Sequence, residues 1–189
     1  MRPIRITLGP LATADADGIC QSQTPAGAGA MTINGALATG GVATMDAGRR
    51  VLITTAADET TKTFTITGTN WFGVPISETI AGVNNTTTYS TLDFETVTSV
   101  TVSAATAGAI LVGTNGIASS PPLPLDMYAN AEVALQVDVT GTVNYTVQQT
   151  LDNVFDEDVV LNWFNSSDSN VVGATGSKQS NYAYAPASS

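Results

Sequence analysis

The chain has 189 residues, of which only 12% are charged, and its 6 basic and 16 acidic residues give a formal net charge of −10. It contains no histidine and one cysteine, which excludes Ser-His-Asp, Cys-His and His-zinc chemistry, an intrachain disulfide and a thiolate-bound metal. So few Lys and Arg also argue against binding nucleic acid through its phosphates. Composition therefore predicts a protein that is not an enzyme and that takes no cofactor, metal ion or nucleic acid.

The beginning of the chain carries the first strand pattern. In residues 2–8, apolar Ile4, Ile6 and Leu8 alternate with polar side chains, which predicts a half-buried strand. This segment lacks the uninterrupted apolar region of a secretory signal, and no stretch approaches the roughly 20 apolar residues of a membrane helix. We therefore expect a protein made in the cytoplasm that has no membrane partner.

The middle of the chain alternates short strand patterns with turn signals. Residues 13–30 are mainly small or polar and predict a long loop or arm, in which Cys20 is a small buried side chain. In residues 62–68, Phe64 and Ile66 share one face and the threonines share the other. Further strands are predicted at residues 50–55, 75–80, 97–103 and 109–113.

The strongest alternation lies in residues 132–150. Two in-phase runs flank Thr140-Gly141, which predicts an antiparallel hairpin. The three prolines within residues 119–126 cannot continue a strand ladder and mark a boundary. We therefore expect residues 1–120 to form a β-sandwich domain that includes an N-terminal arm. Residues 121–189 then hold a Pro-rich connection, the hairpin and a C-terminal tail, or complete the same sandwich.

The tail is polar, rich in Gly, Ser and Asn, and predicts either a mobile end or an arm that orders against a partner. Many short strands without a helical pattern favour an all-β protein. The predicted fold class is an antiparallel β-sandwich, jelly-roll or Ig-like, with long loops and a polar C-terminal tail.

Acidic side chains are the only abundant reactive groups. Residues 15–18 and 152–158 crowd carboxylates in loops but lack EF-hand spacing, so we expect solvated loops. The alternative is a weak structural cation at Asp156, Glu157 or Asp158.

A pair of carboxylates is the best enzyme site that this composition permits, because glycosidases need only two acids flanking the scissile bond. Glu78 and Asp93, near Trp71-Phe72, are the one place that mixes acids with aromatic side chains. The simpler interpretation is an aromatic pair packed at the end of a hairpin, so a hydrolase is the third hypothesis.

The low charge has a second meaning. Thr, Ser and Gly lose little side-chain entropy when a surface is covered, and interfaces are depleted in Lys and Glu. A Thr-rich β-protein with few charges therefore suits a component of a larger assembly. An extracellular adhesion module would share these features.

Several phrases of the chain resemble small structural proteins of tailed bacteriophages. They include RPIRITLGPLATADADGI, FTITGTNWFGVPISETI, VTSVTVSAATAGAILVGTNG and VDVTGTVNYTV, and the likeness extends from Arg2 to about Thr150. The shared phrases are strands and turns without a catalytic motif, so no residue roles carry over. The resemblance implies a virion-associated β-sandwich, a capsid decoration or cement protein seated on the major capsid protein.

We therefore expect a non-enzymatic virion structural protein that is made in the host cytoplasm and lies on the capsid surface. It binds the major capsid protein, stabilises the phage head and forms a homo-oligomer, for which a trimer suits a site of local three-fold symmetry. The alternative is a tail- or fibre-associated module that binds a host surface receptor or glycan. Aromatic anchors are common at interfaces, and the candidate contact residues are Trp71, Phe72, Trp163, Phe164, Tyr182 and Tyr184.

Overall fold

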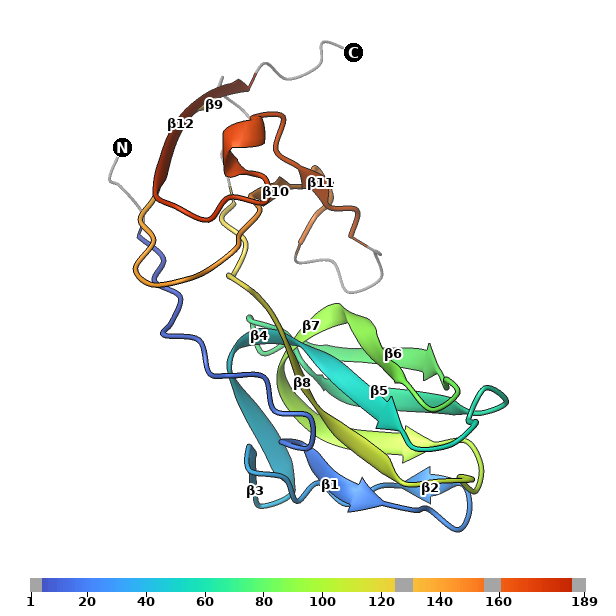
Figure 1. Ribbon diagram of the computed structural model, residues 1–189. Coiled ribbons are helices and arrows are strands. Elements are labelled where there is room, and N and C mark those ends of the chain that lie inside the picture. The colour runs from blue at the N-terminus through green and yellow to red at the C-terminus, as the bar shows by residue number, and fades with distance from the viewer. Residues whose placement is uncertain (1–4, 125–130, 155–160, 185–189) are drawn as a thin grey trace. The chain divides into compact units, whose positions relative to one another are not determined.

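The computed structural model describes residues 5–124, 131–154 and 161–184. The chain divides into two compact units, Met1–Pro121 and Pro122–Ser189. Strands and one short 3-10 helix make up the regular structure of the described residues, and every paired strand is antiparallel (Figure 1). The predicted all-β antiparallel class is therefore confirmed, while a jelly-roll or Ig-like sandwich stays a prediction.

The first unit is an eight-stranded sheet. Its central path runs β1-β8-β4-β7-β5-β6, with β2 paired to β7 and β3 paired to β4. The strands are β1 (Cys20–Gln23), β2 (Gly29–Ala30), β3 (Ala38–Thr39), β4 (Val42–Thr55), β5 (Thr63–Thr69), β6 (Pro75–Ala81), β7 (Thr87–Val102) and β8 (Ile110–Ser119).

The core of this unit follows from the alternation along its strands. In β5, Phe64 and Ile66 are fully buried while the alternating Thr63, Thr65 and Thr67 are exposed or half-exposed, which confirms the predicted faces. Each such burial contributes roughly 1.5–3 kcal/mol. Cys20 lies in the same core, as expected, and burial raises the pKa of its thiol to about 12.

The long central strands pair irregularly at one point that matters for the rest of the unit. Thr44 of β4 pairs with Thr96 of β7, but Arg49 pairs with Phe94, so residues 45–48 form a bulge in β4. A bulge bends the strand and redirects its side chains. The bulge here places a charged side chain toward the interior, as described below.

The second unit contains β9 (Ala131–Val137), β10 (Gln148–Gln149), β11 (Phe164–Asn165), the 3-10 helix η1 (Ser169–Val171) and β12 (Lys178–Tyr184). The hairpin predicted within residues 132–150 is wrong. β9 pairs with β12, β10 pairs with β11, and Tyr145 forms a bridge with Ala174. Alternation defines the two faces of a strand but leaves its partner open.

The structure differs from three further predictions. Residues 5–8 form no strand, and Ile6 and Leu8 are 44% and 46% exposed, while residues 1–4 lie outside the described part. Residues 13–30 contain the short strands β1 and β2 as well as loop. The tail is a strand as far as Tyr184 and pairs within the chain with β9.

A buried carboxylate fastens the loops at one end of the first unit. Glu59 is fully buried, and its Oε1 accepts hydrogen bonds from the amides of Ala107 (2.7 Å) and Gly108 (2.8 Å). Its Oε2 lies 2.7 Å from the ammonium of Lys62. Burial raises the pKa of Glu59, but Lys62 and the two amides together outweigh burial, so this pKa lies below its usual value. The segment after β4 is thereby tied to the β7–β8 loop.

We predict that Glu59→Gln lowers the free energy of unfolding by about 2 kcal/mol at pH 7, because it removes the charge that Lys62 faces. A depressed folded-state pKa stabilises above the ordinary value of 4.5 and loses this contribution as pH falls through the folded-state pKa. Urea unfolding of both proteins from pH 7 to pH 3 should therefore show the difference shrinking in acid. Glu95→Gln is the control, and a constant difference across this range contradicts the prediction.

Candidate interface surfaces

The N-terminal arm, residues 5–12, is held to the sheet by Asp46 in the β4 bulge and by Arg49 directly after the bulge. The amide of Ala12 donates to Asp46 Oδ2 (2.7 Å), and the carbonyl of Ala12 accepts from Arg49 Nη2 (2.9 Å). Arg49 also donates to Asp46 from Nε (2.7 Å) and from Nη2 (2.8 Å). Both main-chain groups of Ala12 are thus satisfied by side chains, as a neighbouring strand would satisfy them.

The clamp formed by Asp46 and Arg49 stays charged at physiological pH. Arg49 is only 2% exposed, so its guanidinium depends on the carboxylate that it faces. The hydrogen bond from Arg49, aided by the amide of Ala12, lowers the pKa of Asp46 to about 2 although burial opposes the shift. The sequence carries a signal for this clamp, because Arg49 falls on the buried phase set by Val51 and Ile53.

Beyond the clamp, the arm exposes apolar side chains. Ile6 and Leu8 are nearly half exposed, and Leu11 is exposed as well. Scattered apolar side chains are ordinary on a protein surface, but several on one extended segment mark a contact region. The arm therefore joins the candidate contacts that were predicted from aromatic residues.

The aromatic pair Trp71-Phe72 divides into an inward and an outward residue. Both lie in the turn between β5 and β6, where Asn70 Oδ1 accepts from the amides of Phe72 (2.9 Å) and Val74 (3.1 Å). The indole of Trp71 is half-buried over Gly48, where any Cβ would collide with it, and Nε1 donates to the carbonyl of Ser119 (3.3 Å). Phe72 is 39% exposed. Trp71 is thus a packing residue, and Phe72 is the residue that the turn presents.

The two carboxylates near this turn act within the sheet. Glu78 accepts hydrogen bonds from the amide and hydroxyl of Thr91 and from the amide of Leu92, at 2.9 to 3.0 Å. Asp93 lies opposite Arg50, with 3.8 Å between Oδ1 and Nε. Burial, with a smaller contribution from Glu78, raises the pKa of Asp93 against the effects of Ser119 and Arg50. Glu78 thus ties β6 to Thr91 and Leu92 of β7, and Asp93 pairs with Arg50 of β4.

The second unit supplies the other predicted aromatic residues. Phe164 in β11 is 64% exposed, and Trp163 beside it is also exposed. Tyr182 and Tyr184 lie in β12, and their side chains are outside the described part. The structure therefore presents Phe72, Trp163 and Phe164 to solvent and withdraws Trp71.

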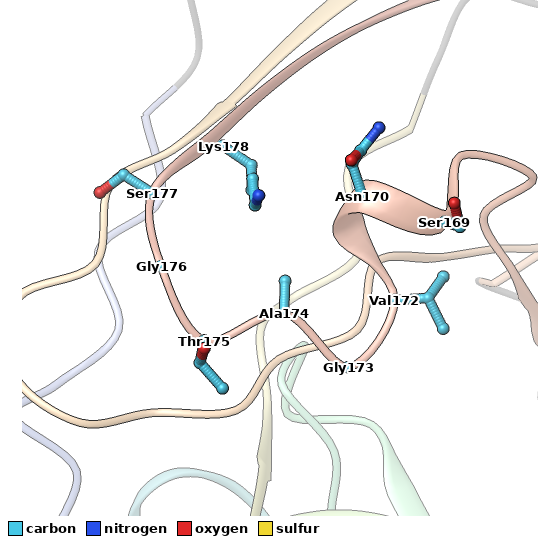
Figure 2. A pocket seen from close by; sticks show the side chains of 9 residues that line it. All are labelled: Ser169, Asn170, Val172, Gly173, Ala174, Thr175, Gly176, Ser177 and Lys178. Atoms are coloured by element: carbon cyan, nitrogen blue, oxygen red, sulfur yellow. The ribbon is translucent and has the colours of Figure 1, made fainter.

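A polar hollow of about 430 Å³ lies in the second unit between η1 and the start of β12. Figure 2 shows the side chain of Lys178 over it, with Ser169 and Asn170 across from it. Within the described residues the side chain of Lys178 has no hydrogen bond or ion pair. It is the one basic residue of residues 122–189, whose acidic residues are Asp126, Glu132, Asp138, Asp152, Asp156, Glu157, Asp158 and Asp168.

The structure offers no metal cluster in the parts of the chain that it describes, where groups of three or more His, Cys, Asp or Glu do not converge. The alternative cation site at residues 156–158 lies outside those parts. Likewise, none of the described segments forms a helix that is long and apolar enough to cross a membrane.

Comparisons with protein-family models, with curated proteins and with solved structures give no match to this chain.

The clamp yields a direct prediction. Asp46→Asn leaves the buried Arg49 without its carboxylate, so the free energy of unfolding should fall by about 3 kcal/mol. The amide of Ala12 should exchange with solvent at least tenfold faster, because it loses a charged acceptor. Hydrogen exchange and urea unfolding measure both effects, and Asp58→Asn, at an exposed carboxylate, is the control. An Ala12 amide that exchanges equally in both variants contradicts the assignment.

Proposed function

We propose that this protein is a non-enzymatic structural protein of a tailed-bacteriophage virion, a capsid decoration or cement protein that binds the major capsid protein and stabilises the head. The observation that carries the proposal is the arm, which the ion pair of buried Arg49 and partly exposed Asp46 anchors at Ala12 while Ile6 and Leu8 remain exposed. An anchored segment with exposed apolar side chains suits a partner surface. The sequence resemblance to phage structural proteins supplies the class of partner.

The outer faces of the sheet support the same proposal. Hydroxyl groups pair across neighbouring strands between Thr65 and Thr79 (2.9 Å) and between Thr69 and Thr96 (2.7 Å). Side chains that are already ordered lose little entropy when a partner covers them. Many copies on a repeating shell would add avidity, so that each contact can be weak. We place the protein on the capsid surface, made in the host cytoplasm, as a homo-oligomer for which a trimer suits local three-fold symmetry.

A second candidate function is a tail- or fibre-associated module that binds a host receptor or glycan. The observation that favours it is the hollow under Lys178, which is lined by hydroxyl and amide side chains, in a unit that also exposes Trp163 and Phe164. Hydroxyl, amide and aromatic groups are the kinds of side chain that fix a ligand in a pocket.

Copy number separates the two functions. A decoration protein should occur in many copies over the shell, whereas a tail module should occur in few copies at one vertex. Electron microscopy of intact particles, with the protein located by a bound antibody fragment, measures this directly. Density confined to the tail vertex contradicts the decoration proposal.

Phe72 gives the sharper test of the contact surface, because Trp71 also packs on Gly48 and its loss would disturb the fold. We predict that Phe72→Ser weakens binding to undecorated heads about tenfold or more, as loss of an aromatic anchor does. Binding is measured as the occupancy of purified heads over a titration. Tyr89→Ser is the control, since it removes another exposed aromatic ring from the β4–β7 face. Equal occupancy by wild type and Phe72→Ser removes this turn from the contact.

A further inference from the structure

The chain contains two Asn-Gly pairs, Asn34-Gly35 and Asn115-Gly116, and both lie in the first unit. An asparagine side chain is most easily modified when glycine follows it, because no Cβ obstructs the glycine nitrogen. That nitrogen can attack the side-chain carbonyl carbon of the asparagine, which closes a five-membered succinimide ring and releases ammonia. The structure gives the two pairs very different surroundings.

At Asn34-Gly35 the glycine amide is held in place. The amide of Gly35 donates to the carbonyl of Ile19 (2.9 Å), and the amide of Asn34 donates to the same carbonyl (3.1 Å). Gly35 is buried, and a Cβ on it would collide with the main chain of Gly18. A nitrogen that is hydrogen-bonded and closely packed cannot turn toward the preceding side chain. We therefore expect Asn34 to be stable in the folded protein.

Asn115-Gly116 lies in a bulge of β8. Three residues of β8, 115–117, separate the positions that pair with Arg49 and Val51, whereas only one residue separates these two on β4. An extra residue of this kind is left out of the strand ladder. Gly116 is exposed, and a Cβ on it would meet nothing within 4 Å beyond its chain neighbours. The main chain at this glycine therefore has room to move.

A hydrogen bond within the bulge prepares the side chain of Asn115 for attack. The amide of Ile117 donates to Asn115 Oδ1 (3.0 Å). This bond folds the side chain back over the peptide bond that joins Asn115 to Gly116. It also stabilises the negative charge that Oδ1 gains when the Gly116 nitrogen attacks Cγ.

Arg49 supplies a second hydrogen bond at the same peptide group. Its Nη1 donates to the main-chain carbonyl of Asn115 (3.5 Å). That carbonyl and the nitrogen of Gly116 belong to one peptide group, so a nearby positive charge stabilises the group after the nitrogen loses its proton. Arg49 is only 2% exposed and is paired with Asp46, so this charge is fixed in position.

We propose that Asn115 is a site of spontaneous succinimide formation and deamidation in the folded protein. Hydroxide removes the amide proton of Gly116, and the nitrogen forms a bond to Asn115 Cγ. The Cγ–Nδ2 bond breaks, and the leaving nitrogen takes a proton from water and departs as ammonia. Water then opens the succinimide. Addition at Cγ leaves an aspartate, whereas addition at the main-chain carbonyl carbon leaves an isoaspartate, in which the chain continues through the side chain.

Either product changes the charge next to the clamp formed by Asp46 and Arg49. A carboxylate replaces a neutral amide in the residue whose carbonyl Arg49 contacts, so this surface becomes more negative as the protein ages. The inference depends on the bulge of the first unit alone and is independent of the proposed role in the virion.

Mass spectrometry of the full-length protein tests the site. The folded protein is kept at pH 8 and sampled over several weeks, and its peptides report the amide-to-acid mass change and isoaspartate at each Asn-Gly pair. We expect Asn115 to react about tenfold or more faster than Asn34, because the amide of Gly35 is held. Equal rates at the two pairs overturn the inference. So does an Asn115 that stays intact in the folded protein while it reacts in the urea-unfolded chain.

A substitution of the attacking residue tests the chemistry. Gly116→Ala fits the open space at this position, and its methyl group should slow the reaction at Asn115 about tenfold or more by obstructing the nitrogen. Gly27→Ala is the matched control, since a Cβ meets equally open space there, and it should leave the rate at Asn115 unchanged. Urea unfolding checks that both variants fold. A rate that Gly116→Ala leaves unchanged, or a product without isoaspartate, overturns the succinimide route.

The folded wild type provides the final comparison through its charge. Isoelectric focusing should show an acidic species that grows with the modified fraction at Asn115, and Gly116→Ala should delay it to the same extent. An acidic species that appears equally fast in both proteins overturns the assignment to Asn115.

Discussion

The ion pair between the buried Arg49 and the partly exposed Asp46 is the constraint on which the first unit depends. Arg49 occupies a core position of β4, and a guanidinium can remain there only if a carboxylate and main-chain oxygens satisfy it. The bulge at residues 45–48 supplies the carboxylate at the required place. The same bulge brings Gly48 against the indole of Trp71, so one irregular segment anchors both the arm and the β5–β6 turn.

The sequence allowed the faces of the strands to be predicted but gave little information about their partners. Phe64 and Ile66 lie on the buried face of β5 because a strand with period two has a definite interior side. Residues 132–139 alternate as clearly as those of β5, yet β9 pairs with residues 178–184, more than 40 residues from its start. Pairing depends on which distant strand has a complementary edge, and alternation within one segment holds no such information.

The candidate contacts show the same limit. Aromatic type identified Phe72, Trp163 and Phe164, which the structure exposes, but it could not separate Phe72 from Trp71. The difference comes from Gly48, a residue distant in sequence whose missing side chain leaves space for the indole. The apolar side chains of residues 5–12 were not predicted as a contact, because the alternation of residues 2–8 predicts a half-buried strand. That prediction assumes a partner strand, and the described part of the chain provides none.

The two units differ in how many of their charged and apolar side chains have partners within the same unit. In the first unit these charged groups all have partners in the same unit. Arg49 with Asp46 holds the arm, Lys62 with Glu59 holds the loops beside β5, and Glu78 binds the backbone of β7. In the second unit the ammonium of Lys178 has no hydrogen bond or ion pair with a described residue, and β9 and β12 pair only with each other there. Val171 and Ala174 are the buried apolar side chains of its described part. A low overall charge lets a β-protein be covered by neighbours at small entropic cost. That charge is divided unevenly, because the arm is basic and the second unit is acidic. An acidic partner surface therefore suits the arm, and a basic partner surface suits the second unit.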